Sequence, residues 1–353
     1  MVLFLLTKSV TFDTLSFVIK SESLRFDLFK RNEDQKKMKK ILLISLILMS
    51  SLLFVACGNN EGTSNENEKL QIVATFYPMY EFTKEVVGEE GDVSLLIPAG
   101  TEMHDYEPSA KNVAEISEAD AFVYNSHELE TWAENLQSNT ENTLFIEAAG
   151  QISLMEANGE DYNHDHEEND HEHEEDGHNH SHDPHVWVDP VLAMVEVETI
   201  RDALSEQFPE KSEIFTANAE KYLAELKTLD DEFTAAFANA GNTTFVTQHS
   251  AFAYLAKQYG LRQESIAGIS SEEEPTPSRL AELKHFVEDH QVTVIYFEEN
   301  ASSKVAETLA KETGVTLAVL NPLESLTNEQ IEAGANYLSV MRDNLQALQL
   351  SIQ

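Results

Sequence analysis

The chain of 353 residues is long enough for about two domains of ordinary size, and its 42% hydrophobic content excludes a wholly disordered protein. Its formal net charge of −40, from 23 basic and 63 acidic residues, argues against a nucleic-acid partner, because phosphates are neutralised by clustered Lys and Arg. Cations are the natural partners of so acidic a chain.

The N-terminal part of the chain contains a long apolar run, residues 41–56, with four lysines just before it and Cys57 just after it. This run is shorter than the roughly 20 residues of a membrane-spanning helix and is typical of the apolar core of a signal peptide. We expect a signal peptide at residues 38–56, with residues 1–37 as an upstream extension before the true start at Met38. The alternative is a signal anchor in which Cys57 is incidental.

The segment Leu53-Phe54-Val55-Ala56-Cys57 resembles a bacterial lipobox, in which the cysteine is lipidated and becomes the new N-terminus. This resemblance implies a lipid anchor at Cys57 that holds the protein on the extracytoplasmic face of the cell membrane of a Gram-positive bacterium. Residues 57–69 are polar and of low complexity, which predicts a flexible tether. Cys57 is the sole cysteine, so no disulfide can form within a monomer, the oligomeric state that we expect.

Strand-like and helix-like segments alternate through residues 70–208, which predicts an N-terminal α/β lobe. We expect strands at residues 72–75, 93–97, 121–124 and 143–146, and helices at residues 78–87 and 110–118. The same alternation in residues 241–353 predicts a second α/β lobe. Its expected strands are 244–247, 265–269, 292–297 and 316–320, and its expected helices are 251–259, 277–290 and 304–313.

Residues 209–240 separate the two predicted lobes. Residues 210–239 contain no Gly or Pro, and apolar side chains recur there at spacings of three and four, which predicts one helix of about 45 Å. A long rigid helix between two Rossmann-like lobes implies limited hinge motion. The alternative is a helix that simply packs on one lobe.

Three candidate metal ligands follow predicted strands of the two lobes. His104 follows strand 93–97, His249 follows strand 244–247, and Glu298 ends strand 292–297. Ligands bind beyond the carboxyl ends of the strands in open parallel sheets, so these three residues can converge on one cleft between the lobes. His185 lies in a proline-bracketed loop, Asp183-Pro184-His185-Val186-Trp187-Val188-Asp189-Pro190, that leads into a predicted helix.

The runs 244–256 and 266–278 closely resemble the zinc-binding members of the metal-specific solute-binding lipoproteins of ABC transporters. Further matches at residues 124–132, 183–190 and 297–307 extend the resemblance over essentially all of residues 70–353. The family implies a metal held between two lobes by His104, His185 and two second-lobe ligands, which correspond to His249 and Glu298. Glu299 and a water molecule remain alternatives for the fourth ligand.

The resemblance implies that the protein captures Zn²⁺ with high affinity and delivers it to an ABC permease and its ATPase subunit for zinc import. Three imidazoles and one carboxylate form a four-coordinate set that suits Zn²⁺ better than Mn²⁺. A closed site leaves no position for a catalytic water, so we expect no enzyme activity. The alternatives are a manganese-binding relative and a surface adhesin.

A second histidine cluster occupies residues 161–183, where the histidines alternate with Asp, Glu, Asn and Gly. So acidic and Gly-containing a tract predicts an exposed loop outside any core. Three interpretations stay open: a low-affinity zinc collector beside the cleft, a solvated loop with incidental histidines, and a site for Cu²⁺ or Ni²⁺. The histidines of this loop are His164, His166, His171, His173, His178, His180 and His182.

Overall fold

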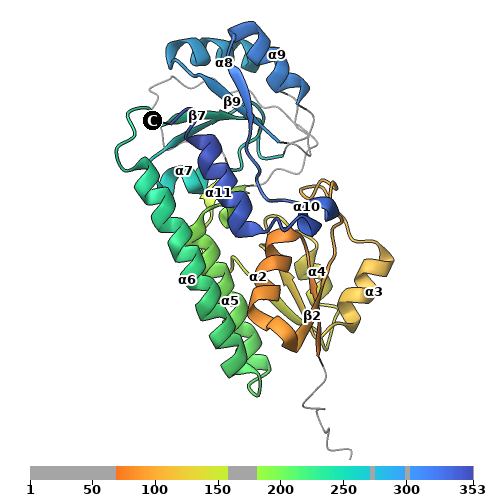
Figure 1. The fold of residues 1–353 in the computed structure, drawn as a ribbon. Helices are drawn as coiled ribbons and strands as arrows, with labels where there is room; N and C mark the ends of the chain where they lie inside the picture. Colours follow the sequence, from red (N-terminus) through yellow and green to blue (C-terminus); the bar gives the residue numbers. More distant parts are fainter. Residues whose placement is uncertain (1–68, 158–180, 271–274, 299–302, 353) are drawn as a thin grey trace, which may run out of the picture. The chain divides into compact units, whose positions relative to one another are not determined.

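A computed structural model of the protein describes residues 69–157, 181–270, 275–298 and 303–352 (Figure 1). These residues belong to one compact unit, Glu68–Gln353. The expected signal peptide, Cys57 and nearly all of the expected tether lie outside the described residues. None of the helices in the described ranges is long and apolar enough to cross a bilayer.

The first lobe contains a parallel four-stranded sheet with the strand order β2-β1-β3-β4. Side chains alternate between its two faces. Ile72 of β1 belongs to a hydrophobic cluster that includes residues of α2, and the next residue, Val73, belongs to another that includes Ile116 of α3. A capping box formed by Ser109 and Asn112 starts α3. The strands are β1 (Leu70–Ala74), β2 (Gly91–Leu95), β3 (Ala121–Tyr124) and β4 (Leu144–Glu147), and the helices are α2 (Tyr77–Val87), η1 (Gly88–Glu90), α3 (Ala110–Glu118) and α4 (Ala133–Gln137).

The second lobe contains another parallel sheet, with the order β10-β9-β7-β8. Its strands are β7 (Thr244–Thr247), β8 (Arg262–Ser265), β9 (Val294–Phe297) and β10 (Thr316–Val319), and its helices are α7 (Ala253–Gln258), α8 (Pro277–Asp289) and α9 (Lys304–Thr313). Buried apolar side chains of β7 and β9 pack with those of α8 and α9. The prediction of two α/β lobes is therefore confirmed.

One strand of the second sheet was placed wrongly by the sequence analysis. The expected strand at 265–269 is absent from the described residues, and β8 lies at Arg262–Ser265. The sequence of β8 is Arg-Gln-Glu-Ser and its side chains are only half-buried, because β8 is an edge strand. An edge strand tolerates polar side chains, so the apolar run that follows it gave a misleading signal.

Two long helices, α5 (Pro190–Gln207) and α6 (Ser212–Phe237), lie side by side and come between the two sheets in the sequence. The predicted linking helix corresponds to α6, whose 26 residues span about 39 Å. Its apolar face is buried, and it packs on α2 of the first lobe. The ring of Phe233, near its C-terminal end, stacks on Tyr259 of the second lobe at 5.1 Å. The helix therefore contacts both lobes (Figure 1).

The C-terminal helix α11 (Tyr337–Leu348) was not predicted, and it also contacts both lobes. The Tyr337 ring packs edge-on against Phe82 of α2, with the centroids 5.0 Å apart. Tyr296 of β9 donates a hydrogen bond to Ala347 O at 2.8 Å. The remaining short elements are β5 (Met155–Glu156), β6 (His182–Asp183), η2 (Val186–Val188) and α10 (Asn328–Glu332).

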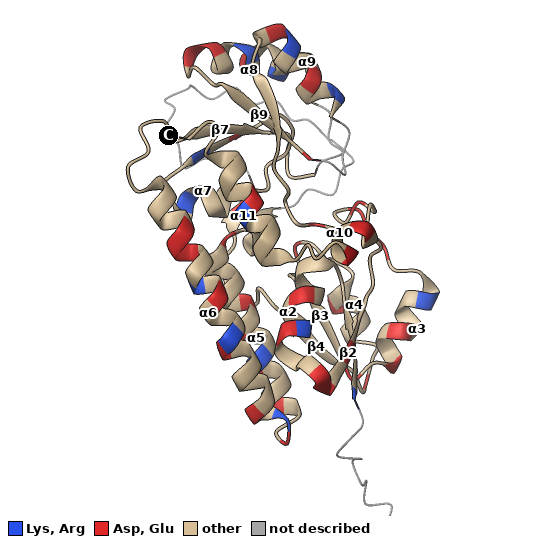
Figure 2. Cartoon of the chain, viewed as in Figure 1, with Lys and Arg blue, Asp and Glu red and all other residues tan. Residues whose placement is uncertain are grey.

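Basic residues are scattered over the helices among more numerous acidic ones (Figure 2). Several form exposed ion pairs, such as Lys69 with Asp92 at 3.1 Å, which contribute little to stability. Lys211 forms a more buried pair with Glu90 at 2.5 Å beside the start of α6. The part of the chain drawn in colour shows no basic stripe of the kind that would follow a nucleic-acid backbone.

Glu196 of α5 is an acidic residue in the protein interior. Its side chain is fully buried, and neither carboxyl oxygen has a hydrogen-bond partner among the described residues. Burial, with a smaller contribution from the charge of Glu130, raises the pKa of Glu196 well above its usual value. Burial therefore favours the protonated carboxyl in the folded protein relative to the unfolded chain.

We predict that Glu196→Met raises the free energy of unfolding at pH 7 by about 1–3 kcal/mol, because the substitution removes a buried polar group without partners. A raised carboxyl pKa makes the folded state less stable as pH rises above the unfolded pKa. The gain should therefore shrink as pH falls toward 4.5. Urea unfolding in EDTA between pH 4.5 and 8 measures it.

Glu196→Gln provides the matched control, because it keeps a polar group of similar size but cannot titrate. Glu196→Gln should make the free energy of unfolding depend less on pH than in the wild type. At pH 7 it should raise this free energy by less than Glu196→Met does. A Glu196→Met protein that is less stable than the wild type at pH 7 would contradict the assignment of this carboxyl as unsatisfied.

Candidate metal centre

His104 lies in the loop after β2. The first residues of this loop continue the sheet, since Leu96 N and Ile97 N donate to Ala74 O and Thr75 O at 2.8 Å each. The backbone N–H of His104 donates to Glu102 Oε1 at 3.0 Å, which fixes the turn locally. His104 is 5% exposed. The loop therefore carries the imidazole from the strand end into the protein interior.

His185 lies between β6 and η2 and is fully buried. Asp183 holds it: Oδ1 of Asp183 accepts from the backbone N–H of His185 at 2.9 Å and from its Nδ1 at 2.7 Å. Tyr254 in turn donates to Asp183 O at 2.6 Å, and Asn125 donates to Pro184 O at 3.0 Å. Contacts from both lobes thus orient this ring so that Nε2 is left for a ligand.

His249 follows β7 and is also fully buried. Its carbonyl oxygen accepts hydrogen bonds from Thr247 Oγ1 at 2.7 Å and from Gln263 Nε2 at 3.0 Å. Its Nδ1 forms a hydrogen bond with Glu298 Oε1. This carboxylate fixes the ring so that Nε2 points toward the other two histidines.

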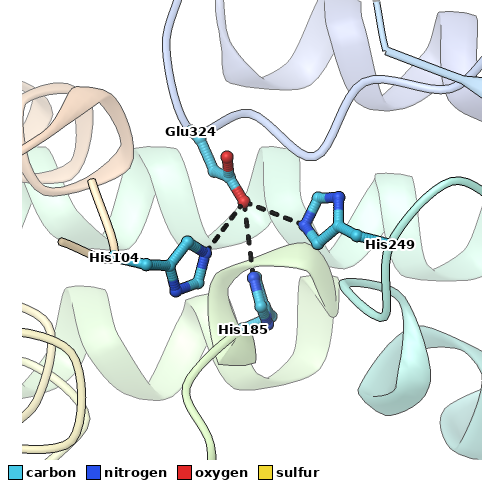
Figure 3. A group of neighbouring side chains, drawn as sticks. All are labelled: His104, His185, His249 and Glu324. Atoms are coloured by element: carbon cyan, nitrogen blue, oxygen red, sulfur yellow. Dashed lines mark hydrogen bonds and ion pairs between the residues drawn. The ribbon is translucent and has the colours of Figure 1, made fainter. Parts of the chain in front are cut away.

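The three rings converge on one carboxylate oxygen (Figure 3). Oε1 of Glu324 lies 3.5 Å from His104 Nε2, 3.4 Å from His185 Nε2 and 3.1 Å from His249 Nε2. One ligand atom from each of the four residues lies within 4.8 Å of every other. The Glu324 side chain is 14% exposed, so the cluster is close to the surface at this one corner.

The fourth residue of this cluster is Glu324 and not Glu298, the residue that we expected from the sequence. Glu298 is buried at the end of β9, as its strand position implied, but its carboxylate contacts Nδ1 of His249. The other nitrogen of that ring faces the cluster, so Glu298 lies on the far side of the ring. The alternative, Glu299, lies outside the described residues.

A sequence signal for Glu324 existed, because it follows β10 as His249 follows β7. It lies five positions beyond the strand end, so the pattern of a ligand immediately after a strand missed it. Apolar anchors within this turn, Leu323 and Leu326, are buried in the core cluster that also contains Trp187. The turn therefore returns toward the first lobe and brings Glu324 with it.

The cluster has dimensions that fit a tetrahedral metal ion. Ligand atoms 2.0–2.2 Å from a tetrahedral Zn²⁺ would be about 3.3–3.6 Å apart. The three distances from Oε1 of Glu324, 3.1–3.5 Å, are close to this range. In addition, carboxylates hold the second nitrogens of His185 and His249, an arrangement that is common around metal-bound histidines.

The electrostatics of the cluster centre on His249. Burial lowers its pKa, but Glu298 and Glu324 flank the ring and together raise its pKa well above the usual value. Burial raises the pKa of Glu298, with His249 opposing the rise. Burial acts in the same direction on Glu324, but the surrounding histidines outweigh it and hold its pKa well below the usual value. A cation that binds here would compete with protonation of His249.

The predicted histidine-rich loop lies almost entirely outside the described residues, which include only His182. This residue sits in β6, and its Nδ1 pairs with Glu128 Oε1 at 2.9 Å. Ser181 donates to the same oxygen at 3.0 Å. The six other histidines, His164, His166, His171, His173, His178 and His180, are not described.

Fold and cluster together define a two-lobed α/β protein with a buried cluster of potential metal ligands contributed by both lobes. The chain belongs to the family described as "Zinc-uptake complex component A periplasmic". The model of this family matches residues 72–350. This match confirms the resemblance recognised in the sequence. The family is one of uptake components and not of enzymes.

Three known proteins illustrate the similarity. The zinc-binding protein AdcA of Streptococcus pyogenes serotype M3 is 47% identical over 322 residues, which are 89% of this chain and 62% of the relative. The chain thus spans about three fifths of the length of that relative. The structure of the Zn(II)-bound ZnuA-like domain of Streptococcus pneumoniae AdcA is 46% identical, with a TM-score of 0.69, over 80% of this chain and 99% of that one.

A second solved structure has the same fold and is described with a further role. It is the laminin-binding protein Lmb of Streptococcus agalactiae, described as bifunctional with adhesin and metal-transporting activity. The match is 37% identical with a TM-score of 0.69 and covers 80% of this chain and 99% of Lmb.

We predict that Asp183→Asn weakens divalent-metal binding by about 10–100-fold, because it removes the charge that orients His185 and increases its basicity. The amide oxygen introduced by this substitution could still accept from Nδ1, so the loss would report the charge and not merely the hydrogen bond. Competition with a chelator of known affinity measures the change. Glu128→Gln is the control, since this carboxylate contacts His182 outside the cluster. Equal losses in both variants would contradict the prediction.

Proposed function

We propose that the protein captures Zn²⁺ outside the cytoplasm with high affinity and delivers it to an ABC permease and its ATPase subunit for zinc import. The observation that carries this proposal is the convergence of three imidazole nitrogens on Glu324 Oε1 at 3.1–3.5 Å in a buried cluster. Zn²⁺ is the transported cargo and not a catalytic cofactor. The zinc-binding relatives and the uptake family support this assignment.

The ligand set in this proposal is His104, His185, His249 and Glu324, with Glu298 as the residue that orients His249. Glu324 is favoured because its oxygen lies against all three Nε2 atoms. Three imidazoles and one carboxylate favour Zn²⁺, whereas Mn²⁺ prefers sites richer in oxygen ligands. The manganese alternative from the sequence analysis is therefore the less favoured one.

The place of capture in this proposal is the outer face of the membrane, with Cys57 as the lipidated anchor and residues 57–69 as the tether. The lipobox-like sequence at 53–57 supports this part. The histidine-rich loop would hold additional zinc weakly beside the cluster, because His182 and the histidine ligand His185 are only three positions apart. The protein would act as a monomer.

A second candidate function is adhesion to a host surface, which the structural similarity to the laminin-binding protein Lmb favours. The two functions make different demands on the cluster. Adhesion through the outer surface would survive loss of the buried histidines, whereas zinc capture would not. Laminin binding by the His104→Ala/His249→Ala double variant distinguishes them.

We predict one tight Zn²⁺ site per chain that is lost, by at least ~100-fold in affinity, in both His249→Ala and Glu324→Ala. Glu298→Gln should retain the site with a loss of about tenfold, because it orients a ligand without binding the ion. The affinity should fall as pH drops, since the imidazoles must be neutral to bind and the pKa of His249 is raised. Competitive titration with Zn²⁺ and Mn²⁺ between pH 5.5 and 8 measures these effects.

The control for this titration is a variant that lacks residues 163–180, which should keep the tight site and lose only weak ones. Equal affinities for the two metals would favour the manganese alternative. If Glu298→Gln abolished binding while Glu324→Ala did not, the assignment of the fourth ligand would be reversed.

Delivery to a permease predicts that cells producing only His249→Ala fail to grow when zinc is limited by a chelator, and that added zinc but not manganese restores growth. Zinc accumulation by these cells measures the defect directly. Cys57→Ser separates lipidation from capture: it should lose incorporation of labelled fatty acid and cleavage before residue 57, while its purified form binds Zn²⁺ normally. If the wild-type chain were neither labelled nor cleaved there, residues 41–56 would be a signal anchor.

A further inference from the structure

The turn between β10 and α10 carries Glu324, and its backbone is held by a side chain from α11. Asn344 of α11 is 2% exposed. Its Oδ1 accepts from Asn321 N at 2.8 Å, and its Nδ2 donates to Asn321 O at 2.7 Å. Both polar atoms of one buried amide thus pair with the two backbone groups of one residue, as a neighbouring strand would. Two hydrogen bonds from one amide fix the orientation of the Asn321 backbone relative to α11 as well as its distance from that helix.

The side chain of Asn321 also stabilises this turn. Oδ1 of Asn321 accepts from Leu323 N at 2.7 Å. Leu323 has a φ of 63°, in the left-handed region that a leucine rarely adopts. It is fully buried and directly precedes Glu324. A strained backbone of this kind persists only where its surroundings determine it, and here the surroundings are the asparagine pair and the core.

The turn is also held from the side of the first lobe. Trp187 Nε1 donates to Pro322 O at 2.8 Å. The Trp187 ring lies beside His185, with the centroids 5.1 Å apart. Tyr337, at the start of α11, donates to Trp187 O at 2.6 Å. One helix therefore supports both the turn of Glu324 and the tryptophan next to His185.

We infer that Asn344 is a positioning residue of the metal centre: its amide fixes Asn321 and thereby places the Glu324 carboxylate over the three histidines. This inference rests on the proposed function. The other buried residues in this part of α11, such as Met341 and Leu348, are apolar and pack in the core. An apolar residue at position 344 would fill the same space. The amide of Asn344 therefore serves a different purpose, which is to pair with the backbone of the turn.

The test is zinc titration of the full chain in three variants, with urea unfolding measured in parallel. Asn344→Leu removes both hydrogen bonds while keeping a side chain of similar length and good helix propensity. We expect it to weaken zinc binding by about tenfold, the lower end for residues that orient metal ligands. Asn344→Asp keeps the acceptor for Asn321 N and loses the donor, so its loss should be smaller. Leu348→Ala is the control, which should lower stability and leave zinc affinity unchanged.

A double-mutant cycle of Asn344 with Glu324 distinguishes positioning of the Glu324 carboxylate from a general loss of structure. In a Glu324→Ala background the three histidines still bind zinc weakly, and adding Asn344→Leu should change that affinity by less than ~2-fold. An equal loss in both backgrounds would overturn the inference, as would wild-type affinity in Asn344→Leu. If Asn344→Leu does not fold, the same cycle with Asn344→Asp decides. Absence of tight zinc binding by the wild-type chain would instead refute the proposed function.

Discussion

The structure depends on holding four polar side-chain atoms, all potential metal ligands, close together in the protein interior. Three imidazole nitrogens surround one carboxylate oxygen at 3.1–3.5 Å, and all three histidines are buried. Such a group is stable only if the remaining polar atoms are satisfied. Asp183 and Glu298 do this for His185 and His249, so these two carboxylates set the direction of the two rings that they contact.

The fold supplies these atoms from both lobes and then fixes the lobes to each other. Loops after β2, β7 and β10 bring in His104, His249 and Glu324, and the segment before α5 brings in His185. Two helices contact both lobes: α6 through a continuous apolar face and α11 through tyrosine contacts. A site assembled in this way cannot open widely without separating core residues.

Much of the fold could be predicted from the sequence, because apolar runs such as those of β3 and β9 and capped helices such as α3 are local signals. The three histidines could be found from their motifs. Glu324 was missed although it follows β10, because the hydrogen bonds between Asn321 and Asn344 that hold its turn span 23 residues and leave no local pattern. Glu298 had the local pattern of a strand-end ligand, but tertiary structure placed it behind His249. Similarly, β8 is polar because it lies at an edge of the sheet.

The pairing of α11 with the Glu324 turn also bears on how the chain reaches its native state. The cluster joins residues as distant in sequence as His104 and Glu324, and contacts between distant segments form late and slowly. An intermediate in which only the first lobe has formed therefore has two of the four ligand residues and no clamp for a third. Under the proposed function, Zn²⁺ would stabilise the native state by mass action to the extent that it binds the completed cluster more tightly than the unfolded chain.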